Sequence, residues 1–456
     1  MDRAALIAVG LDTAFLHGLG RSLLLAAAVA GVSLAIGWPL GVRVGLTRFP
    51  LRRVLLTLLA LPLLLPSFLV AIGLSMLTPR FDGGLATVGA FACLGVPLVT
   101  FASLAATMAI TRSQADAARL AGGERLLFAL GRRTTFPLAG LAAVLAGVMT
   151  LADPGPGQIF GWRGAASELL VSFAAQHDAS LAARQAWTMA LVSALLAWPL
   201  AWRLAPEVAA GLSARDVARP ELSHSPVSAW WLAGVASLVA LVPLAGLLRP
   251  LLARAWPIAR AWSEVERTAV DTVLYASLAA GIAVAVAFAL AAIAGRAPGR
   301  RRGLVACALA LLALPPALPA LWLIPWSSSV AVGAALALRG LPIALLLALR
   351  AVGSMPASWS EAAHVHGVSN IQFIAQIAVP WCARWGLPAA ALAAMLATAE
   401  IGTVLLLHPP GRGTLPLAIF TIMANAPETL VAMLCLVYTV LVAALAIAVQ
   451  VPAHQR

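Results

Sequence analysis

Residues 430–449 read LVAMLCLVYTVLVAALAIAV and contain no charged side chain. A membrane-spanning helix needs about 20 consecutive, mostly apolar residues, because its backbone polar groups must find their partners inside the helix. A second run of this kind, SLLLAAAVAGVSLAIGWPL, occupies residues 22–40. These two stretches predict an all-α fold whose helices cross a membrane.

The composition of the whole chain points the same way. Of the 456 residues, 62% are hydrophobic and 10% are charged, and the mean hydropathy is +0.96. Soluble domains are roughly 45–50% apolar and about 25% charged, so a large soluble globule and a disordered chain are both excluded. The net charge of +13 comes from arginines that separate the apolar runs, so nucleic acid is not an expected partner. All 30 basic residues are arginine, which excludes an ATP-binding P-loop because that motif requires a lysine.

About eleven segments pass the length test for a membrane span. They lie at residues 21–41, 54–76, 85–110, 138–152, 185–204, 229–248, 268–294, 304–325, 328–350, 382–405 and 427–449. Cytoplasmic loops of membrane proteins collect positive charge. With the N-terminus outside, nineteen arginines fall on the cytoplasmic side and eight on the outer side, so the sequence favours this orientation. Residues 1–20 lack a basic segment followed by a small-residue cleavage site, so no cleaved signal peptide is expected.

Several landmarks occur twice in the same order. RRVLLTLLALPLLLP at 52–66 is matched by RRGLVACALALLALPPALP at 301–319, with the prolines 253 positions apart. The other matched pairs lie 245 to 249 positions apart: DAARLAG at 116–122 with EAAHVHG at 361–367, ADPG at 152–155 with AEIG at 399–402, and Arg163-Gly164 with Arg412-Gly413. This near-constant spacing predicts two parallel, tandem repeats. Their expected bounds are 1–204 and 229–456, joined by a cytoplasmic linker at 205–228, and the second repeat has one additional leading helix.

The most specific motif is Glu361-Ala362-Ala363, followed by Gly367 six positions after the glutamate and by Pro380 nineteen positions after it. The first repeat carries a weaker copy, in which Asp116-Ala117-Ala118 is followed by Gly122 and then by Pro137. The pattern resembles the EAA loop of type I ABC importer permeases. Two such loops on one chain resemble the fused permeases of the ferric-iron and thiamine transporter type.

This resemblance implies a permease subunit of an ATP-driven, binding-protein-dependent importer in the bacterial inner membrane. Its implied partners are two copies of a cytoplasmic ATPase, which bind ATP-Mg, and an extracytoplasmic substrate-binding protein. The chain itself is then no enzyme, has no cofactor, and docks the ATPases through coupling loops at 111–137 and 354–380. The first substrate expectation is ferric iron, with thiamine, phosphonate, polyamine and small oxyanions as alternatives.

The residues of the second loop suit such docking on physical grounds. Ser354 can cap a short helix over 354–374, Pro356 suits its first turn, and the small side chains of Ala362 and Ala363 allow close approach of another surface. Gly367 can adopt a positive φ and turn the chain, and Pro380 can then restart a helix at the membrane. The alternative is an ordinary amphipathic loop at the membrane surface.

Three charged residues are candidates for the passage or an outer gate: Asp153, Glu400 and Arg339. An ionisable group at membrane depth is costly and indicates a pathway or a partner. The two acids are alternatively helix-end carboxylates held by Arg163 or Arg412, and a bend at Pro342 would instead leave Arg339 at an interface. The proline clusters at 62–66 and 315–319 predict broken helices near the passage or simple kinks.

Other chemistry has little support in the sequence. His364 and His366 have no third ligand nearby, so no metal site is expected. H-E-x-x-H and G-x-S-x-G are both absent, so no hydrolase machinery is indicated. A secondary transporter driven by an ion gradient is the alternative function, because parallel repeats also occur in that class.

Overall fold

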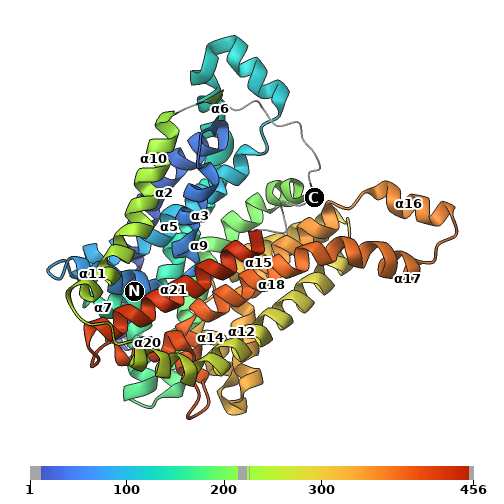
Figure 1. The fold of residues 1–456 in the computed structure, drawn as a ribbon. Coiled ribbons are helices and arrows are strands. Elements are labelled where there is room, and N and C mark those ends of the chain that lie inside the picture. Colours follow the sequence, from blue (N-terminus) through green and yellow to red (C-terminus); the bar gives the residue numbers. More distant parts are fainter. Residues whose placement is uncertain (1–11, 214–222, 225, 451–456) are drawn as a thin grey trace.

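The computed structural model describes residues 12–213, 223–224 and 226–450 as a bundle of long helices (Figure 1). Within those residues, 9 helices are long and apolar enough to cross a membrane, and a bent pair of shorter helices raises the number to at most 10. The nine are Thr13–Leu46, Gly83–Thr107, Arg112–Leu151, Ala179–Ser213, Val227–Ala253, Ile258–Ala294, Ser329–Gly353, Asn370–Ala399 and Glu428–Ala448. The chain is therefore an all-α, multi-pass membrane protein.

Two of the sequence-predicted spans are broken. The fragments are α3 (Arg52–Leu64) with α4 (Ser67–Leu77), and α13 (Pro298–Leu311) with α14 (Ala317–Leu323). The first pair meets at an angle of 103°. Its break follows from Pro66, because the residue before a proline is pushed toward extended backbone and Leu65 has φ −99° and ψ 148°. Pro315 and Pro316 lie in the second break, so the predicted span 304–325 is not among the nine.

The two halves of the described chain contain corresponding elements. After α2 (Thr13–Leu46), α3 and α4, the first half continues with α5 (Gly83–Thr107), α6 (Arg112–Leu151), α7 (Gly155–Ile159), α8 (Ala165–Leu170) and α9 (Ala179–Ser213). After α12 (Ile258–Ala294), α13 and α14, the second half continues with α15 (Ser329–Gly353), α16 (Ala357–Val365), α17 (Asn370–Phe373), α18 (Val379–Ala399), α19 (Ile401–Leu407), α20 (Leu415–Ile422) and α21 (Glu428–Gln450). The predicted short span at 138–152 is the end of α6, which begins at Arg112.

Packing within the halves also corresponds. Helix α2 packs along α5 and α6, and α12 packs along α15 and α18. The backbone N–H of Ala165 donates to Ser22 Oγ at 2.9 Å, and the N–H of Leu415 donates to Thr272 Oγ1 at 2.9 Å. The two donors are 250 positions apart in the sequence, and so are the two acceptors, so each half makes the same contact.

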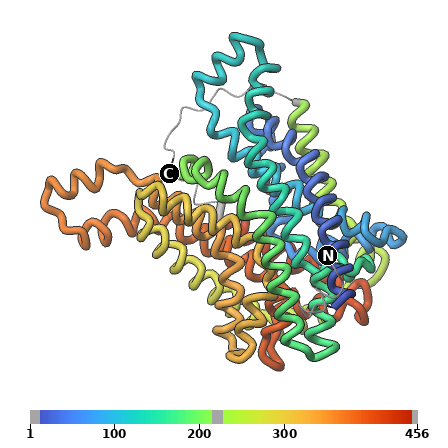
Figure 2. Tube along the Cα trace, turned by 180° about the vertical axis from the view of Figure 1, so that it is seen from behind, coloured from blue at the N-terminus to red at the C-terminus, as the bar shows by residue number. Residues whose placement is uncertain are grey.

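The last helix of the first half packs against the broken helices of the second, and the last helix of the second half packs on α11 (Val242–Ala253), which covers α4. Ala197 and Ala201 of α9 share a buried cluster with Leu309 of α13. Leu434 of α21 shares another cluster with Phe68 of α4. The two halves are therefore interlocked rather than placed side by side, and the tube trace in Figure 2 shows α9 crossing between them.

The additional leading helix of the second half also crosses over. It consists of α10 (Pro226–Ala236), a π-helical turn (Ser237–Leu241) and α11 (Val242–Ala253), and it packs on α3 and α4. Gly73 and Gly246 let the backbones of α4 and α11 touch, because a methyl group added at Gly246 would overlap the carbonyl oxygen of Gly73. Nearby, β1 (Thr47–Arg48) pairs in parallel with β2 (Ser223–His224).

The predicted linker starts later than residue 205, because α9 continues to Ser213. Most of the remaining linker, residues 214–222 and 225, lies outside the described residues.

Several arginines cap the ends of helices. The last carbonyls of a helix have no partner within it, and a guanidinium has five N–H donors for such groups. Arg301, which is only 5% exposed, donates to the carbonyls of Gly295 (3.2 Å) and Leu349 (2.9 Å). Arg350 donates to the carbonyls of Gly211 and Leu212 at the end of α9, and Arg52 donates to that of Val44. These arginines lie on the predicted cytoplasmic side and fix neighbouring helix ends to one another.

Candidate functional site

Each half places an acid at a helix break. Asp153 lies between α6 and α7, and Glu400 lies between α18 and α19. Asp153 Oδ1 accepts a hydrogen bond from the N–H of Gly155 at 2.9 Å, and Glu400 Oε1 accepts one from the N–H of Gly402 at 2.9 Å. Both carboxylates thus bind the backbone two residues ahead, at the start of the short helix that follows.

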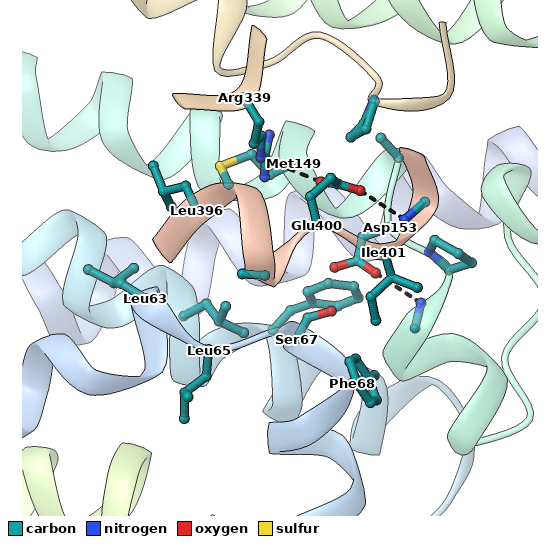
Figure 3. A pocket seen from close by; sticks show the side chains of 18 of the residues that line it. Leu63, Leu65, Ser67, Phe68, Met149, Asp153, Arg339, Leu396, Glu400 and Ile401 are labelled. Atoms are coloured by element: carbon teal, nitrogen blue, oxygen red, sulfur yellow. Dashed lines mark hydrogen bonds and ion pairs between the residues drawn. The ribbon is translucent and has the colours of Figure 1, made fainter. Parts of the chain in front are cut away.

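A cavity of about 120 Å³ brings the two breaks together (Figure 3). Corresponding residues of the two halves line it, among them Asp153 with Glu400 and Met149 with Leu396, each pair 247 positions apart. The broken helices contribute Leu65 from the first half and Leu314 from the second. The cavity therefore lies at the interface of the two halves.

Arg339 projects into this cavity from the middle of α15. Its Nε lies 3.6 Å from Glu400 Oε2, and its Nη1 donates to the carbonyl of Leu312 at 3.3 Å. That carbonyl is in the break between α13 and α14, where a continuous helix would have used it. The side chains of Arg339 and Glu400 are 21% and 12% exposed, respectively, so the ion pair is largely shielded from solvent. Helix α15 continues through Pro342, and Arg339 lines the cavity rather than an interface.

The two loop arginines that were expected as alternative partners of the acids, Arg163 and Arg412, do not pair with them in the described part of the chain. Arg412 lies 3.5 Å from Asp271, and no ion pair joins Arg412 or Arg163 to either cavity acid among the described residues. The Ser67 hydroxyl instead lies beside Asp153 in the cavity (Figure 3). Ser67 is the first residue of α4, directly after the break at Pro66.

Sequence reasoning missed Ser67 and Leu94. Leu94 lines the cavity in the first half at the position that corresponds to Arg339. The signal was available, because L-G-V-P at 94–97 matches R-G-L-P at 339–342 with the same 245-residue spacing as the two acid-Ala-Ala motifs. At this pair of corresponding positions the cavity therefore has leucine in the first half and arginine in the second.

The two acid-Ala-Ala motifs lie on segments that project from one side of the bundle, where α2 and α15 end (Figures 1 and 2). In the first, α6 is interrupted at Gly122 and Gly123. In the second, α16 ends before Gly367, which has φ +70°, and α17 follows. The positive φ expected at Gly367 is confirmed. In the first loop Gly123 carries it instead (φ +64°), while Gly122 is extended, because the second glycine of the pair makes the turn.

Two details of the predicted second loop are wrong. Ser354 does not cap the loop helix, because α15 extends to Gly353 and α16 starts at Ala357 after Pro356. The helix does not restart at Pro380 but begins at Asn370 and continues into the membrane span. A π-helical turn at Ile374–Ala378 accompanies Pro380, whose missing N–H would leave a carbonyl of a regular helix unpaired.

The motif residues divide between a packed side and an open side. Ala118 and Ala363 are buried, whereas Asp116, Ala117, Glu361 and Ala362 are exposed. At corresponding positions further on, Leu120 and Val365 are 91% and 83% exposed. Such apolar side chains, held outward beyond the span, are typical of a surface that another protein covers.

The two loops differ in how their acids are engaged. Asp116 lies 3.7 Å from the Nε of Arg112 and 3.6 Å from a guanidinium nitrogen of Arg119. Within the described residues, Glu361 makes no ion pair. The carboxylate of the second loop is therefore open to a cation from outside the chain.

Comparison of the chain with protein-family models, with curated proteins and with solved structures finds no match in any of the three. Its function is therefore inferred from the cavity and the two projecting loops.

Proposed function

We propose that this chain is the membrane-spanning permease subunit of an ATP-driven, binding-protein-dependent importer of the bacterial inner membrane, and that its two halves are tandem repeats. The observation that carries the proposal is the pair of projecting loops. Each presents an exposed acid and alanine, Asp116-Ala117 or Glu361-Ala362, on the same side of the bundle. Two equivalent loops on one side match two copies of a cytoplasmic ATPase, each binding ATP-Mg.

The helices that follow the loops connect each loop to the cavity, so they can transmit a movement of the bound ATPase. From Gly123 onward α6 leads to Asp153, and from Asn370 the second helical span leads to Glu400. A displacement of either loop is therefore delivered to the cavity by a single helical segment. The role of this chain is mechanical, and ATP hydrolysis belongs to the partner.

The solute would cross between the two halves, through the cavity that holds Asp153 and Glu400. In this class a separate extracytoplasmic binding protein delivers the solute and supplies much of the specificity. Ferric iron remains our first substrate expectation, and thiamine, phosphonate, polyamine and small oxyanions remain alternatives.

The test is uptake by vesicles that contain the chain, its partner ATPase and the binding protein. We expect uptake to require ATP and to continue when a protonophore dissipates the proton gradient. Binding of the ATPase to the purified chain should weaken in Glu361→Lys while the chain still inserts into the membrane. Unchanged binding in that variant would rule out the docking role of the second loop.

The buried ionic cluster favours one other function. Ion-gradient transporters use acids at membrane depth, and Asp153 and Glu400 face one cavity beside Arg339. For a secondary transporter we expect uptake without ATP that collapses with the proton gradient, so the same vesicles distinguish the two functions.

A further inference from the structure

The charged residues of the cavity are not the same in the two halves. Its acids correspond, as do Met149 and Leu396, but Leu94 in the first half is matched by Arg339 in the second. The lining thus contains two carboxyl groups and one guanidinium. With both acids ionised, the site carries one negative charge that no residue of the lining neutralises.

The position of the guanidinium shows what it does. It lies 3.6 Å from Glu400 and also donates to the carbonyl of Leu312, in the cavity that Asp153 also lines. Buried charges are stable only when they are paired and hydrogen-bonded. Arg339 thus occupies the place between oxygen acceptors that a free cation would otherwise fill (Figure 3).

We propose that Arg339 is a tethered counter-ion that closes the passage, and that a cationic solute replaces it beside Glu400 and Asp153 during transport. The claim that the cation is transported rests on the proposed function, whereas the cation-binding site can be tested on the chain alone. It narrows the solute to a cation, either a metal ion that prefers oxygen ligands or an organic cation with N–H donors. It argues against the phosphonate and oxyanion alternatives.

The size of the cavity limits what the resting state can hold. Water takes about 30 Å³ in the liquid, so a cavity of about 120 Å³ has room for a small, partly hydrated cation. A larger solute requires the cavity to widen, and withdrawal of the Arg339 side chain from Glu400 would supply part of that space.

Chemical replacement of the guanidinium tests the cation site on the purified chain. Arg339→Ala removes the guanidinium and leaves both carboxyl groups and the Leu312 carbonyl in place. We expect methylguanidinium at millimolar concentration to raise the melting temperature of this variant saturably, by about 1–3 °C. Methylammonium should act more weakly. Urea, and sodium chloride at equal ionic strength, should not act.

Two controls make the effect specific to the cavity. The wild type should not respond, because Arg339 already occupies the site, and Arg339→Leu should not respond, because leucine fills the space. A folded Arg339→Ala protein that responds equally to methylguanidinium and sodium chloride would overturn the proposal.

A second variant keeps the proposal testable if Arg339→Ala does not fold. Leu94→Arg/Arg339→Leu moves the arginine to the corresponding position of the other half, where it faces the same two acids. We expect its melting temperature to exceed that of Arg339→Leu. A melting temperature at or below that of Arg339→Leu would contradict a cation site shared by the two halves.

These measurements use no ATPase, so they fail or succeed independently of the proposed function. Stabilisation by methylguanidinium without ATP-driven uptake would support the cation site and rule out the importer function. ATP-driven uptake without this stabilisation would support the importer function and rule out the cation site.

Discussion

Gly246→Ala is the substitution whose effect can best be worked out from the structure. The added methyl group would overlap the carbonyl oxygen of Gly73 and lie 2.7 Å from its carbonyl carbon. Carbon atoms pack favourably at about 3.5–4.0 Å, so α11 must move away from α4 by roughly 1 Å. Both obstructing atoms belong to the backbone, so no side-chain rotation relieves the overlap.

The expected cost follows from this displacement. Overpacking of a close contact costs about 1–3 kcal/mol. Gly234→Ala, in the same leading helix, is the matched control, because nothing lies within 4 Å of the methyl group it adds. Relief of glycine flexibility in a helix should stabilise that control by up to roughly 0.5–1 kcal/mol. The same gain applies to Gly246→Ala, so we expect the two variants to differ by the overpacking cost, about 1–3 kcal/mol in free energy of unfolding.

Denaturant unfolding of the purified protein, followed by tryptophan fluorescence, measures this difference. Gly73→Ala should behave like Gly246→Ala, and the double variant should cost less than the sum, because one separation of the helices accommodates both methyl groups. Equal unfolding midpoints for Gly246→Ala and Gly234→Ala would show that α11 does not pack on α4 at this point.

Three further predictions concern the loops and the helix ends. Glu361→Gln should weaken ATPase binding by about 2- to 5-fold, the range of an exposed ion pair. Asp116→Asn should weaken it less, because Arg112 and Arg119 already engage that acid. Equal losses of affinity in a binding titration would contradict this ranking. Arg301→Lys should lower the free energy of unfolding by about 1–3 kcal/mol, because an ammonium does not span the two carbonyls that the buried guanidinium joins. The control is Arg300→Lys at an exposed position, whose free energy of unfolding should stay within about 0.5 kcal/mol of the wild type. Gly367→Ala should cost about 1–2 kcal/mol through its φ of +70° alone, since nothing lies within 4 Å of the added methyl group, and a neutral result in the same unfolding assay would refute a positive φ at this turn.

The membrane-spanning character of the chain could be predicted because a run such as 430–449 needs no long-range contact to be recognised. The breaks were also foreseeable, because Pro66 and the Pro315-Pro316 pair disrupt helices locally. The number of spans was less accessible, since hydropathy does not show that the run at 304–325 divides into two short helices.

The candidate site was only partly predictable for a related reason. Asp153, Glu400 and Arg339 were conspicuous as charges in apolar surroundings, but their meeting in one cavity depends on contacts across about 250 residues. Ser67 carries no charge and belongs to no motif, so only the fold reveals that it lines the cavity. Leu94 could have been found from the match of residues 94–97 with 339–342. The tandem repeats, the partners and the substrate remain predictions.

The arginine caps have a chemical consequence. The chain has no lysine side chain, so amine-directed reagents pass over its side chains and dicarbonyl reagents, which modify guanidinium groups, become the informative label. Arg301 is only 5% exposed and both of its terminal nitrogens donate to carbonyls, so it should react slowly. Arg339 has the same protection only while it stays beside Glu400. The rate at which Arg339 is modified would therefore report how often its side chain leaves Glu400 and the passage loses this positive charge.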